Sequence, residues 1–492
     1  MTSQEYLGLI KLLGPECVVV LTALAVLFAD LRFWRGLPNP KRLQRGVMMS
    51  TVGLVIAMLL AGSGENSANL MAGALVLSPV SQFLKLVLLL LTIATVWLCR
   101  DTDFTDHVGE FLALLLLAAT GMMLLVSTEN LLMIFVSLEL VSLSLYVMAA
   151  FNKRSAKSAE AALKYFLFGG MAAAFTLFGF SLLYGLSGSI NLPDIALALR
   201  AKGSDPLAMA AIVMVVTGFG FKIAAVPFHF WAPDAYEGAP APAAAFIASG
   251  SKVASFLILA KLLQAGMPDV AASGSAAWKA FAPGWMPIVA ILAAASMVFG
   301  NLAALAQAGL RRLLACSAIA HAGYALLAVL ANPQDAGPAL LYYVTTYAMT
   351  LVGLFGLISA VERNNDDDSM TRLAGLSQSS PLLAGCLSVF GLSLAGVPPL
   401  AGFFGKFYVF VAVVKSGSSY SAHLWLVLVA IAMSCVSLYY YLQVLKQAWV
   451  AEPAADTKPA QASAALTFVI VALALGVVLL GCFPELLLSH LR

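Results

Sequence analysis

The sequence predicts an all-α polytopic membrane protein with about fourteen transmembrane helices, and two observations carry this prediction. Of its 492 residues, 61% are hydrophobic and only 10% are charged, whereas soluble domains carry about 25% charged residues. Apolar runs of about 20 residues, the length that spans a bilayer, recur along the whole chain. The loops between them are short, so neighbouring helices are expected to pack side by side, with no sizeable soluble domain.

The apolar runs give the expected position of each helix. In order they cover 6–29, 47–63, 80–99, 111–127, 131–151, 161–186, 207–230, 241–265, 286–306, 312–331, 338–361, 381–412 (interrupted), 422–447 and 463–487.

Two lysines, each close to prolines inside an apolar run, indicate an internal repeat. Lys222 lies in helix 7 near Pro227, and Lys406 lies in helix 12 after Pro398 and Pro399. The two helices are five apart, and an odd number of helices per unit inverts its topology. We therefore expect four parts. The first is helices 1–3 (1–110) and the last is helix 14 (463–492). Between them lie two inverted five-helix repeats, which are helices 4–8 (111–266) and helices 9–13 (286–449).

Loop charges predict the orientation of the chain. Lysine and arginine favour cytoplasmic loops, and fifteen of them fall on one side of the predicted topology: Arg32, Arg35, Lys41, Arg42, Arg45, Arg100, Lys153, Arg154, Lys157, Arg311, Arg312, Arg363, Arg372, Lys446 and Lys458. The opposite side has five: Arg200, Lys202, Lys279, Lys415 and Arg492. In a bacterial inner membrane, both termini would then be periplasmic.

Several function classes lack their signatures in this sequence. The six cysteines are far apart and form no CxxC pair, so neither an iron–sulfur cluster nor a structural zinc site is indicated. The basic residues do not cluster as they do in nucleic-acid-binding proteins. No dinucleotide fingerprint, Walker loop, haem or flavin motif is found. The first apolar run has no basic region before it and no A-x-A site, so no cleavable signal peptide is expected.

Three lysines lie deep inside the apolar runs. Lys222 and Lys252 flank a loop with four prolines, and Lys406 has thirty-three charge-free residues before it. An ammonium at the bilayer centre costs roughly 2.5–3.5 kcal/mol on insertion scales, so buried lysines indicate function or a paired partner. A broken helix at membrane depth is tolerated only against protein or a water-filled cavity. Lysines beside broken helices are therefore typical of an ion path.

Glu139 sits in the middle of helix 5, and two interpretations of it remain open. It packs among hydroxyl neighbours such as Ser137 and Ser142, or it pairs with a lysine, for which Lys222 is the candidate. An opposite charge nearby stabilises the protonated form of a buried lysine, and separating the two charges favours release of the proton. Such a pair can load and release a proton.

Three further residues are weaker candidates. His229 follows Lys222 by seven residues, so the two would share a face of a regular helix, although Pro227 lies between them. His229 and His321 are either packing residues or proton carriers, since imidazole exchanges protons near neutral pH. Lys164 lies one turn inside helix 6 and is either a relay residue or an anchor whose ammonium reaches the interface. Lys85 and Lys261, nearer helix ends, are expected to be anchors.

The segment 218–252, GFGFKIAAVPFHFWAPDAYEGAPAPAAAFIASGSK, closely resembles the signature of the antiporter-like membrane subunits of respiratory complex I, the NADH:quinone oxidoreductase. FVSLELVSLSLY, FGNLAALAQAGLRRLLACSAIAHAGYALLA and LSLAGVPPLAGFFGKFYVF resemble it as well, so the resemblance extends over nearly the whole chain. Within the family the chain is most similar to the N branch. It lacks the long lateral helix of the L branch, and it has Lys406 where the M branch has glutamate.

The resemblance implies a proton-translocating subunit. By position it makes Glu139 and Lys222 the interacting pair of a first half-channel, Lys252 the connecting lysine and Lys406 the end of a second half-channel. His229 and His321 match polar positions on the family's central axis, and Lys164 matches a lysine of helix 6.

The resemblance also implies no cofactor in this chain, because NADH, FMN, iron–sulfur clusters and quinone are handled by other subunits. The expected partners are other antiporter-like and small membrane subunits and the lipid bilayer, with no nucleic acid. A Mrp-type cation/proton antiporter subunit is the alternative with the same fold. A structural anchor that moves no ions is a third interpretation, which the set of lysines disfavours.

Overall fold

The computed structural model describes residues 12–63, 67–70, 73–202, 205–267, 284–362, 369–416, 421–452 and 462–491. Within them, thirteen helices are long and apolar enough to cross a membrane. Two shorter helices, α17 (Pro381–Ala395) and α18 (Ala401–Lys415), follow one another across a break and complete the fourteenth expected crossing. The predicted all-α membrane fold is confirmed. Of the loop charges that predict orientation, Arg363, Lys458, Lys279 and Arg492 lie outside the described residues.

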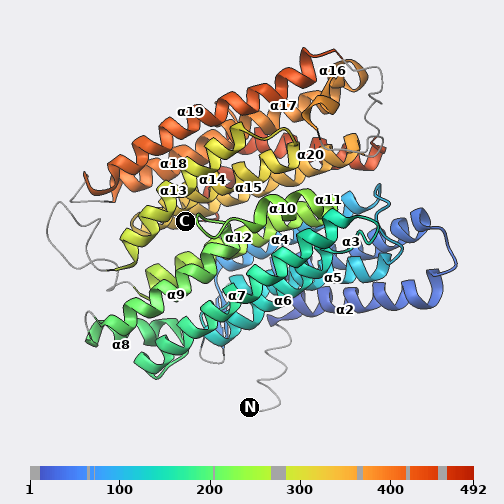
Figure 1. The fold of residues 1–492 in the computed structure, drawn as a ribbon. Helices are drawn as coiled ribbons and strands as arrows, with labels where there is room; N and C mark the ends of the chain where they lie inside the picture. Colours follow the sequence, from blue (N-terminus) through green and yellow to red (C-terminus); the bar gives the residue numbers. More distant parts are fainter. Residues whose placement is uncertain are drawn as a thin grey trace.

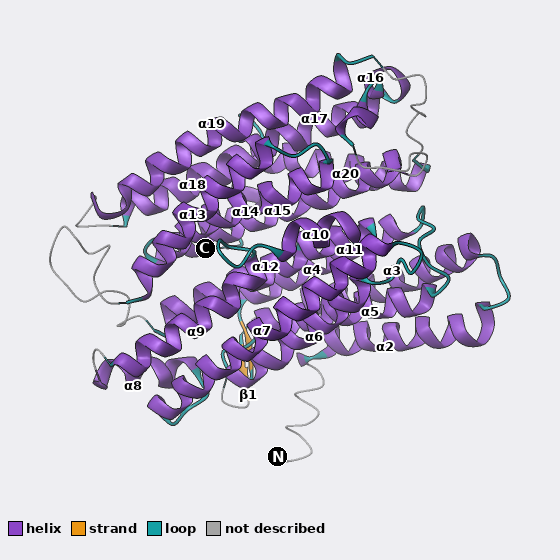
Figure 2. Cartoon of the chain, viewed as in Figure 1, coloured by secondary structure: helices purple, strands orange, loops and turns teal. Residues whose placement is uncertain are grey.

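The first half of the chain forms α2 (Gly14–Ala29), α3 (Asn39–Ser63), α4 (Pro79–Cys99), α5 (Val108–Val126), α6 (Leu131–Ala149), α7 (Ala156–Ser187), α8 (Leu192–Lys202), α9 (Pro206–Ile223), α10 (Trp231–Gly238), α11 (Ala241–Ala248) and α12 (Gly250–Ala260). Turns of π-helix extend α2 over Asp30–Trp34 and α12 over Lys261–Ala265. Strands β1 (Ala68–Leu70) and β2 (Leu75–Leu77) form an antiparallel hairpin, drawn in orange in Figure 2.

The second half forms α13 (Trp285–Leu305), α14 (Leu310–Val329), α15 (Pro333–Glu362), α16 (Leu376–Ser379), α17, α18, α19 (Ser421–Trp449), α20 (Ala464–Cys482) and α21 (Glu485–Leu488). A turn of 3₁₀-helix (Met370–Leu373) precedes α16. In Figure 1 the two halves, blue to green and yellow to red, lie beside each other as two groups of nearly parallel helices.

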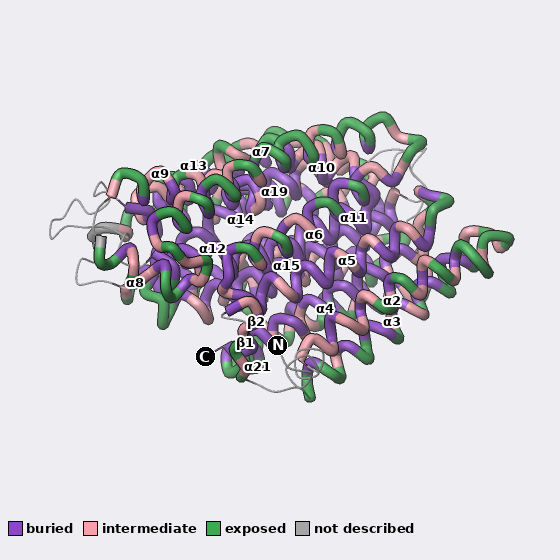
Figure 3. The backbone as a smooth tube through the Cα atoms, turned by 90° about the horizontal axis from the view of Figure 1, so that it is seen from below, coloured by how far each residue is buried: buried purple, intermediate pink, exposed green. Residues whose placement is uncertain are grey.

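The core of the bundle lies where the two halves meet. All residues of α11 and α12 are buried. In the apolar 18-residue stretches of α14 and of α15, 94% of the residues are buried. Figure 3 shows these helices in purple, whereas α7 and the outer parts of α2 and α3 carry much green. The exposed side chains of those outer helices are largely apolar, such as Phe28, Val52 and Phe166. The central helices are therefore shielded from lipid, and polar groups on them must find partners inside the protein.

Two helices are interrupted in the same way. Helix α9 is followed by Ala224, which has φ +59°, and then by a cis Val226–Pro227 bond. Helix α17 is followed by Gly396, which has φ +88°, and then by a cis Pro398–Pro399 bond. A left-handed residue is a common end of a helix, and proline cannot continue one. The cis proline stands three residues after the left-handed residue in both cases, so the two breaks have matching geometry.

Three sequence expectations need correction. The helix expected over 207–230 ends at Ile223, because the backbone turns at Ala224 before the proline is reached. The helix expected over 47–63 begins at Asn39, since its charged first turns are stabilised by a buried ion pair of 2.6 Å between Arg42 Nη2 and Asp30 Oδ2. Helix α8 and the β-hairpin were not predicted, because neither carries an apolar run long enough to span a membrane.

The ends of the bundle differ in charge. The loops that precede α5 and α7, the connection between α10 and α11, the first turns of α3 and α14 and the last turn of α15 come together at one end and line a common cavity of about 740 Å³. We call this the basic end, because it carries most of the loop lysines and arginines. At the opposite end, a second cavity of about 470 Å³ opens beside α15 and α18.

Candidate functional site

Lys222 lies in the last turn of α9 and reaches across to α6. Its Nζ atom is 2.5 Å from Ser142 Oγ and 3.3 Å from Tyr146 Oη. The hydroxyl of Ser142 in turn donates to the carbonyl oxygen of Leu138 at 2.5 Å. Aromatic rings of Tyr146 and Phe221 lie within 6 Å of the ammonium, a distance at which cations are attracted to a ring face. Hydroxyl groups and rings, rather than a direct carboxylate contact, hold this lysine.

A small cavity connects Lys222 to α12. It has a volume of about 10 Å³, and its polar lining consists of Lys222, Ser142, Ser251, Ser255 and the ring of Tyr165. A cavity of about 10–15 Å³ is the smallest that holds one water molecule, provided that two or more polar partners line it. The space thus has the size and the lining for a single bridging water between Lys222 and the helix that carries Lys252.

Lys252 is buried in the interior of the helix bundle, with 3% of its surface exposed. Its ammonium donates to the carbonyl oxygen of Ala318 on α14 at 3.0 Å and lies 5.8 Å from the ring centre of Tyr347 on α15. Helix α11 ends at Ala248, and a turn at Ser249 separates it from α12, so Lys252 sits in the first turn after an interruption. It bridges the first half of the chain to α14 and α15 of the second.

His321 continues this line one turn further along α14. Its Nδ1 is 2.7 Å from Tyr343 Oη, and its ring packs 4.8 Å from the ring of Tyr347. Its Nε2 is buried and has no hydrogen-bond partner in the part of the chain that the structure describes. The imidazole shares the ring of Tyr347 as a neighbour with Lys252, and the ring of Tyr324 as a neighbour with Lys406. His321 therefore stands between the two lysines.

Lys406 lies in α18, and its side chain reaches back across the break to the end of α17. Its Nζ donates to the carbonyl oxygens of Leu394 and Ala395, each at 3.0 Å, and to Ser434 Oγ at 2.9 Å. Those two carbonyls end α17, where the helix dipole favours a positive charge. The ring of Tyr324 lies 5.0 Å away. Three acceptors match the three donors of an ammonium group, so this site suits the protonated lysine.

Glu139 is half-buried on α6, one turn before Ser142. No hydrogen bond or ion pair of its carboxylate is found within the described ranges, but the carboxylate interacts electrostatically with Lys222 and Tyr146. Its neighbours Val136 and Leu143 on the same side of the helix are about half exposed. Glu139 thus lies beside Lys222 without touching it.

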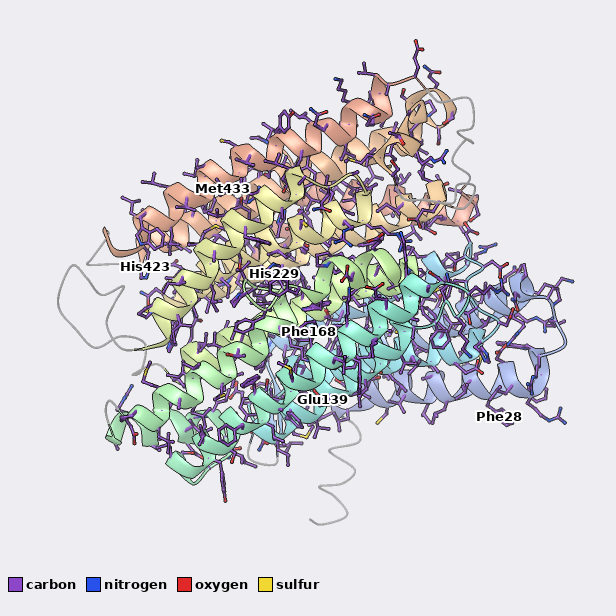
Figure 4. The ribbon with its side chains drawn as sticks, in the orientation of Figure 1. Phe28, Glu139, Phe168, His229, His423 and Met433 are labelled. Atoms are coloured by element: carbon purple, nitrogen blue, oxygen red, sulfur yellow. The ribbon has the colours of Figure 1, made fainter. Side chains whose placement is uncertain are left out.

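The other two candidates lie away from this line. The ring of His229 stacks on Phe230 and meets Phe299 of α13 edge-on, and Figure 4 places it at the border of the two halves, away from Glu139. Because the break separates it from Lys222, the two residues share no helix face. Lys164 is 39% exposed and forms ion pairs with Asp234 (2.7 Å) and Glu160 (2.6 Å) near the basic end.

Three tyrosines of this site, Tyr146, Tyr343 and Tyr347, were not predicted, and Ser142 was predicted only as a neighbour of Glu139. Ser142 and Tyr146 follow Glu139 at the spacing of one and two helical turns, a pattern that could have shown that they share its face. Tyr343 and Tyr347 are likewise one turn apart on α15. Lys85 is not an interface anchor: it is completely buried, and its Nζ lies 2.7 Å from Glu16 Oε1. No signal within the helix of Lys85 indicated this partner.

Lys261, the second expected anchor, is partly exposed near the end of the bundle opposite the basic end. Its Nζ lies 3.6 Å from Glu129 Oε1.

Taken together, buried and half-buried groups that can exchange protons form one line across both halves. It runs from Glu139 through Ser142 and Lys222 to Lys252, and then through His321 to Lys406. Tyrosine rings and hydroxyls accompany it throughout. Within the described ranges no group of three or more His, Cys, Asp or Glu side chains could hold a metal ion. The arrangement is suited to moving protons between side chains and water.

Comparison with known proteins shows to which family the chain is similar. Residues 127–436 match the family described as "NADH:quinone oxidoreductase/Mrp antiporter, TM". The chain is 49% identical to NADH-quinone oxidoreductase subunit N 2 of Acidobacterium capsulatum over 501 aligned positions, which cover 100% of both chains. It is also similar to a chain of respiratory complex I from Thermus thermophilus with bound aureothin, with 35% identity, a TM-score of 0.79 and coverage of 96% and 98% of the two chains.

A chain of the Mrp complex from Dietzia sp. DQ12-45-1b has the same fold, with a TM-score of 0.79, 20% identity and coverage of 96% and 94%. At that identity the likeness concerns the fold alone. The full-length similarity at 49% identity is more specific, and it shows that the chain belongs to the family of NADH-quinone oxidoreductase subunit N.

Proposed function

We propose that this chain is the proton-translocating N-type membrane subunit of a respiratory NADH:quinone oxidoreductase. In this proposal, electron transfer from NADH to quinone takes place in other subunits, which hold the FMN, iron–sulfur clusters and quinone. This chain binds no cofactor and carries protons. Its partners are the other membrane subunits of the complex, in a bacterial inner membrane.

The series of buried and half-buried titratable side chains across both halves is the observation that carries the proposal. A buried ammonium is costly in a bilayer. Lys252 and Lys406 are buried and Lys222 is partly buried, and each ammonium is held by hydroxyl or carbonyl oxygens of another helix. Packing alone does not require such a series. A proton path does, because each step needs a group that can take up and release a proton within reach of the next.

The side chains suggest a sequence of steps. Glu139 on α6 stabilises the charge on Lys222 of α9 through its own negative charge, without a direct contact. When that influence weakens, Lys222 passes its proton through a water in the small cavity beside Ser251 and Ser255 towards Lys252. His321 then accepts a proton on Nε2 and releases the one on Nδ1, or the reverse, between Lys252 and Lys406. In this scheme, His229 and Lys164 lie beside the path and are not stations on it.

The two matching breaks support the proposed division into two five-helix units, 111–266 and 286–449. Each unit has one left-handed residue followed by a cis proline. The charged residues differ, however. Lys406 stands seven residues after its cis proline, and the matching position in the first unit is Asp234, whereas Lys222 stands before its break. We infer that the units share a backbone plan but use it with different chemistry.

Substitution of Lys252 tests the proposed function. In vesicles that contain the assembled complex, Lys252→Met should abolish proton uptake, because it interrupts the line in the middle. Lys252→Arg should not restore uptake, because a guanidinium stays protonated. Full pumping by the arginine variant would leave Lys252 as a fixed charge and overturn the relay. Isolation of the chain with Mrp-type partners, without flavin- and cluster-bearing subunits, would favour the antiporter alternative.

A further inference from the structure

Two buried tyrosine hydroxyls lie between the cavity at the basic end and the centre of the lysine line. Tyr236 is in α10 and is fully buried, and Tyr347 is in α15 and is 7% exposed. Neither hydroxyl has a hydrogen-bond partner in the ranges that the structure describes. Most buried polar atoms are paired, and an unpaired one costs about 1–3 kcal/mol, so two such hydroxyls in one region indicate a role beyond packing.

Tyr347 belongs to the inner end of this region. Its ring lies 4.8 Å from the ring of His321 and 5.8 Å from the ammonium of Lys252. These are the two groups at which the proposed proton path passes from the first half to the second. A hydroxyl here can therefore deliver a proton, through one water, to either of them.

Tyr236 belongs to the outer end. The next residue, Glu237, lines the cavity of about 740 Å³ at the basic end, together with Ser359 and Glu362 of α15. The ring of Tyr236 packs edge-on against Phe355, one turn from Ser359, at 5.9 Å. Its phenol group is also near enough to that of Tyr347 for the two to interact electrostatically.

The side chains of α15 set the direction of this route. Tyr347, Phe355 and Ser359 follow one another at multiples of four residues and so lie on one side of the helix. From Tyr347 to Ser359 the helix rises about 18 Å. Between Tyr347 and Ser359 this face of α15 has only apolar side chains, and Tyr236 packs against it at Phe355. The hydroxyl of Tyr236 therefore provides a polar group in the middle of this stretch.

We infer that Tyr236 and Tyr347 form a proton entry from the cavity at the basic end to Lys252 and His321, each hydroxyl holding an ordered water. In each passage the tyrosine oxygen takes a proton from one water and gives its own proton to the next, so its O–H is restored. The proton ends on the neutral amine of Lys252 or on the imidazole of His321. The inference rests on the proposed proton-translocating function and adds to it the point at which protons join the line.

Replacement of each tyrosine by phenylalanine tests this entry. Tyr236→Phe and Tyr347→Phe remove only the hydroxyl and break no hydrogen bond within the protein. A purely structural role therefore predicts unchanged or improved thermal stability and full pumping. The proposed entry predicts normal assembly with proton uptake slowed by about fivefold to tenfold, the factor that one hydrogen bond represents. The double variant should be no slower than the slower single variant, because both act on one route.

Tyr342→Phe is the matched control. Tyr342 lies on the same helix, but its hydroxyl donates to the carbonyl oxygen of Leu480 at 2.7 Å. This variant should lose thermal stability and keep its proton uptake per electron. The redox-driven rate of the Tyr347→Phe complex should also fall more steeply than that of wild type as the pH at the basic end is raised, since entry then limits the rate.

The outcomes separate this inference from the proposed function. If Lys252→Met blocks pumping while the Tyr236→Phe/Tyr347→Phe complex pumps at the wild-type rate, the entry is wrong and the relay stands. If Lys252→Met pumps normally, the proposed function itself fails. Slower pumping in Tyr342→Phe without loss of stability would overturn the specific role of the two unpaired hydroxyls.

Discussion

The ammonium nitrogen of Lys222 lies 2.5 Å from the hydroxyl oxygen of Ser142, one helical turn beyond Glu139. The serine accepts from the lysine while it donates to the carbonyl oxygen of Leu138. Glu139 therefore acts on Lys222 through its charge, at a distance, and not through a direct hydrogen bond. A pair arranged in this way can be tuned by small movements of α6 against α9, because a charge interaction in a poorly screened interior changes with separation.

The first prediction concerns Glu139→Gln, which keeps the shape and removes the charge. Assembly should be retained, because the carboxylate makes no hydrogen bond in the described structure. Proton pumping should fall, by about tenfold for each 1.4 kcal/mol of charge interaction that is lost. Quinone reduction should slow with it if pumping and electron transfer are tightly coupled. The measurement is proton uptake per electron in reconstituted vesicles.

Glu110→Gln is a suitable control for this variant. Glu110 lies in the first turn of α5 at the basic end, partly exposed and 3.2 Å from His107. The same chemical change there should leave pumping nearly unaffected, because exposed ion pairs contribute about 0–1 kcal/mol. If Glu139→Gln pumps as well as Glu110→Gln, at the same rate and the same ratio to electrons, the carboxylate has no part in loading Lys222.

The lysines could be predicted from the sequence, whereas their partners could not. Lys222, Lys252 and Lys406 stand out because long charge-free runs surround them, and this signal needs no tertiary information. Ser434 and Tyr324 give no such signal, since serine and tyrosine are ordinary in apolar helices. Their roles depend on which helices pack together, and that is decided by the fold as a whole.

Local sequence was also misleading at two places. A period of seven residues suggested that Lys222 and His229 share a face, but the left-handed turn at Ala224 ends the regular helix between them. Lys85 lies near the start of its helix and so was expected at the interface. The carboxylate of Glu16, sixty-nine residues earlier in the chain, instead gives it a partner in the interior. The position of a lysine along its helix therefore does not predict how deeply it is buried when another helix supplies a carboxylate as its partner.

The second prediction concerns orientation. The loop bias places Arg42 in the cytoplasm and the C-terminus in the periplasm. Alkaline phosphatase is active only after export, so a fusion at the C-terminus should be active and a fusion in the loop between α2 and α3 should be inactive. The reverse pattern would exchange the two sides of the membrane, and the cavity at the basic end would then open to the periplasm.

The third prediction concerns the buried pair of Lys85 and Glu16. Lys85→Met leaves an uncompensated carboxylate between α2 and α4, and breaking a buried pair costs about 3–5 kcal/mol. The complex should then lose this subunit at lower temperature. The double variant Glu16→Gln/Lys85→Met removes both charges and should recover most of that stability. A double variant as unstable as the single one would show that the two side chains act separately, and a loss of pumping in a stable double variant would place this pair on a proton path.

The last prediction concerns Gly396, the left-handed residue between α17 and Lys406. A side chain at this φ of +88° is strained by roughly 1–2 kcal/mol. Its Cβ would lie 3.1 Å from Cδ and 3.3 Å from Nζ of Lys406, and so would push the ammonium off the carbonyl oxygens that end α17. Gly396→Ala should therefore lower both thermal stability and proton uptake. Gly385→Ala, in the same helix, has no neighbour within 4 Å of the added Cβ and should gain about 0.5–1 kcal/mol with unchanged uptake. Equal stability and equal pumping in the two variants would show that the contact between Lys406 and the end of α17 is not needed for the path.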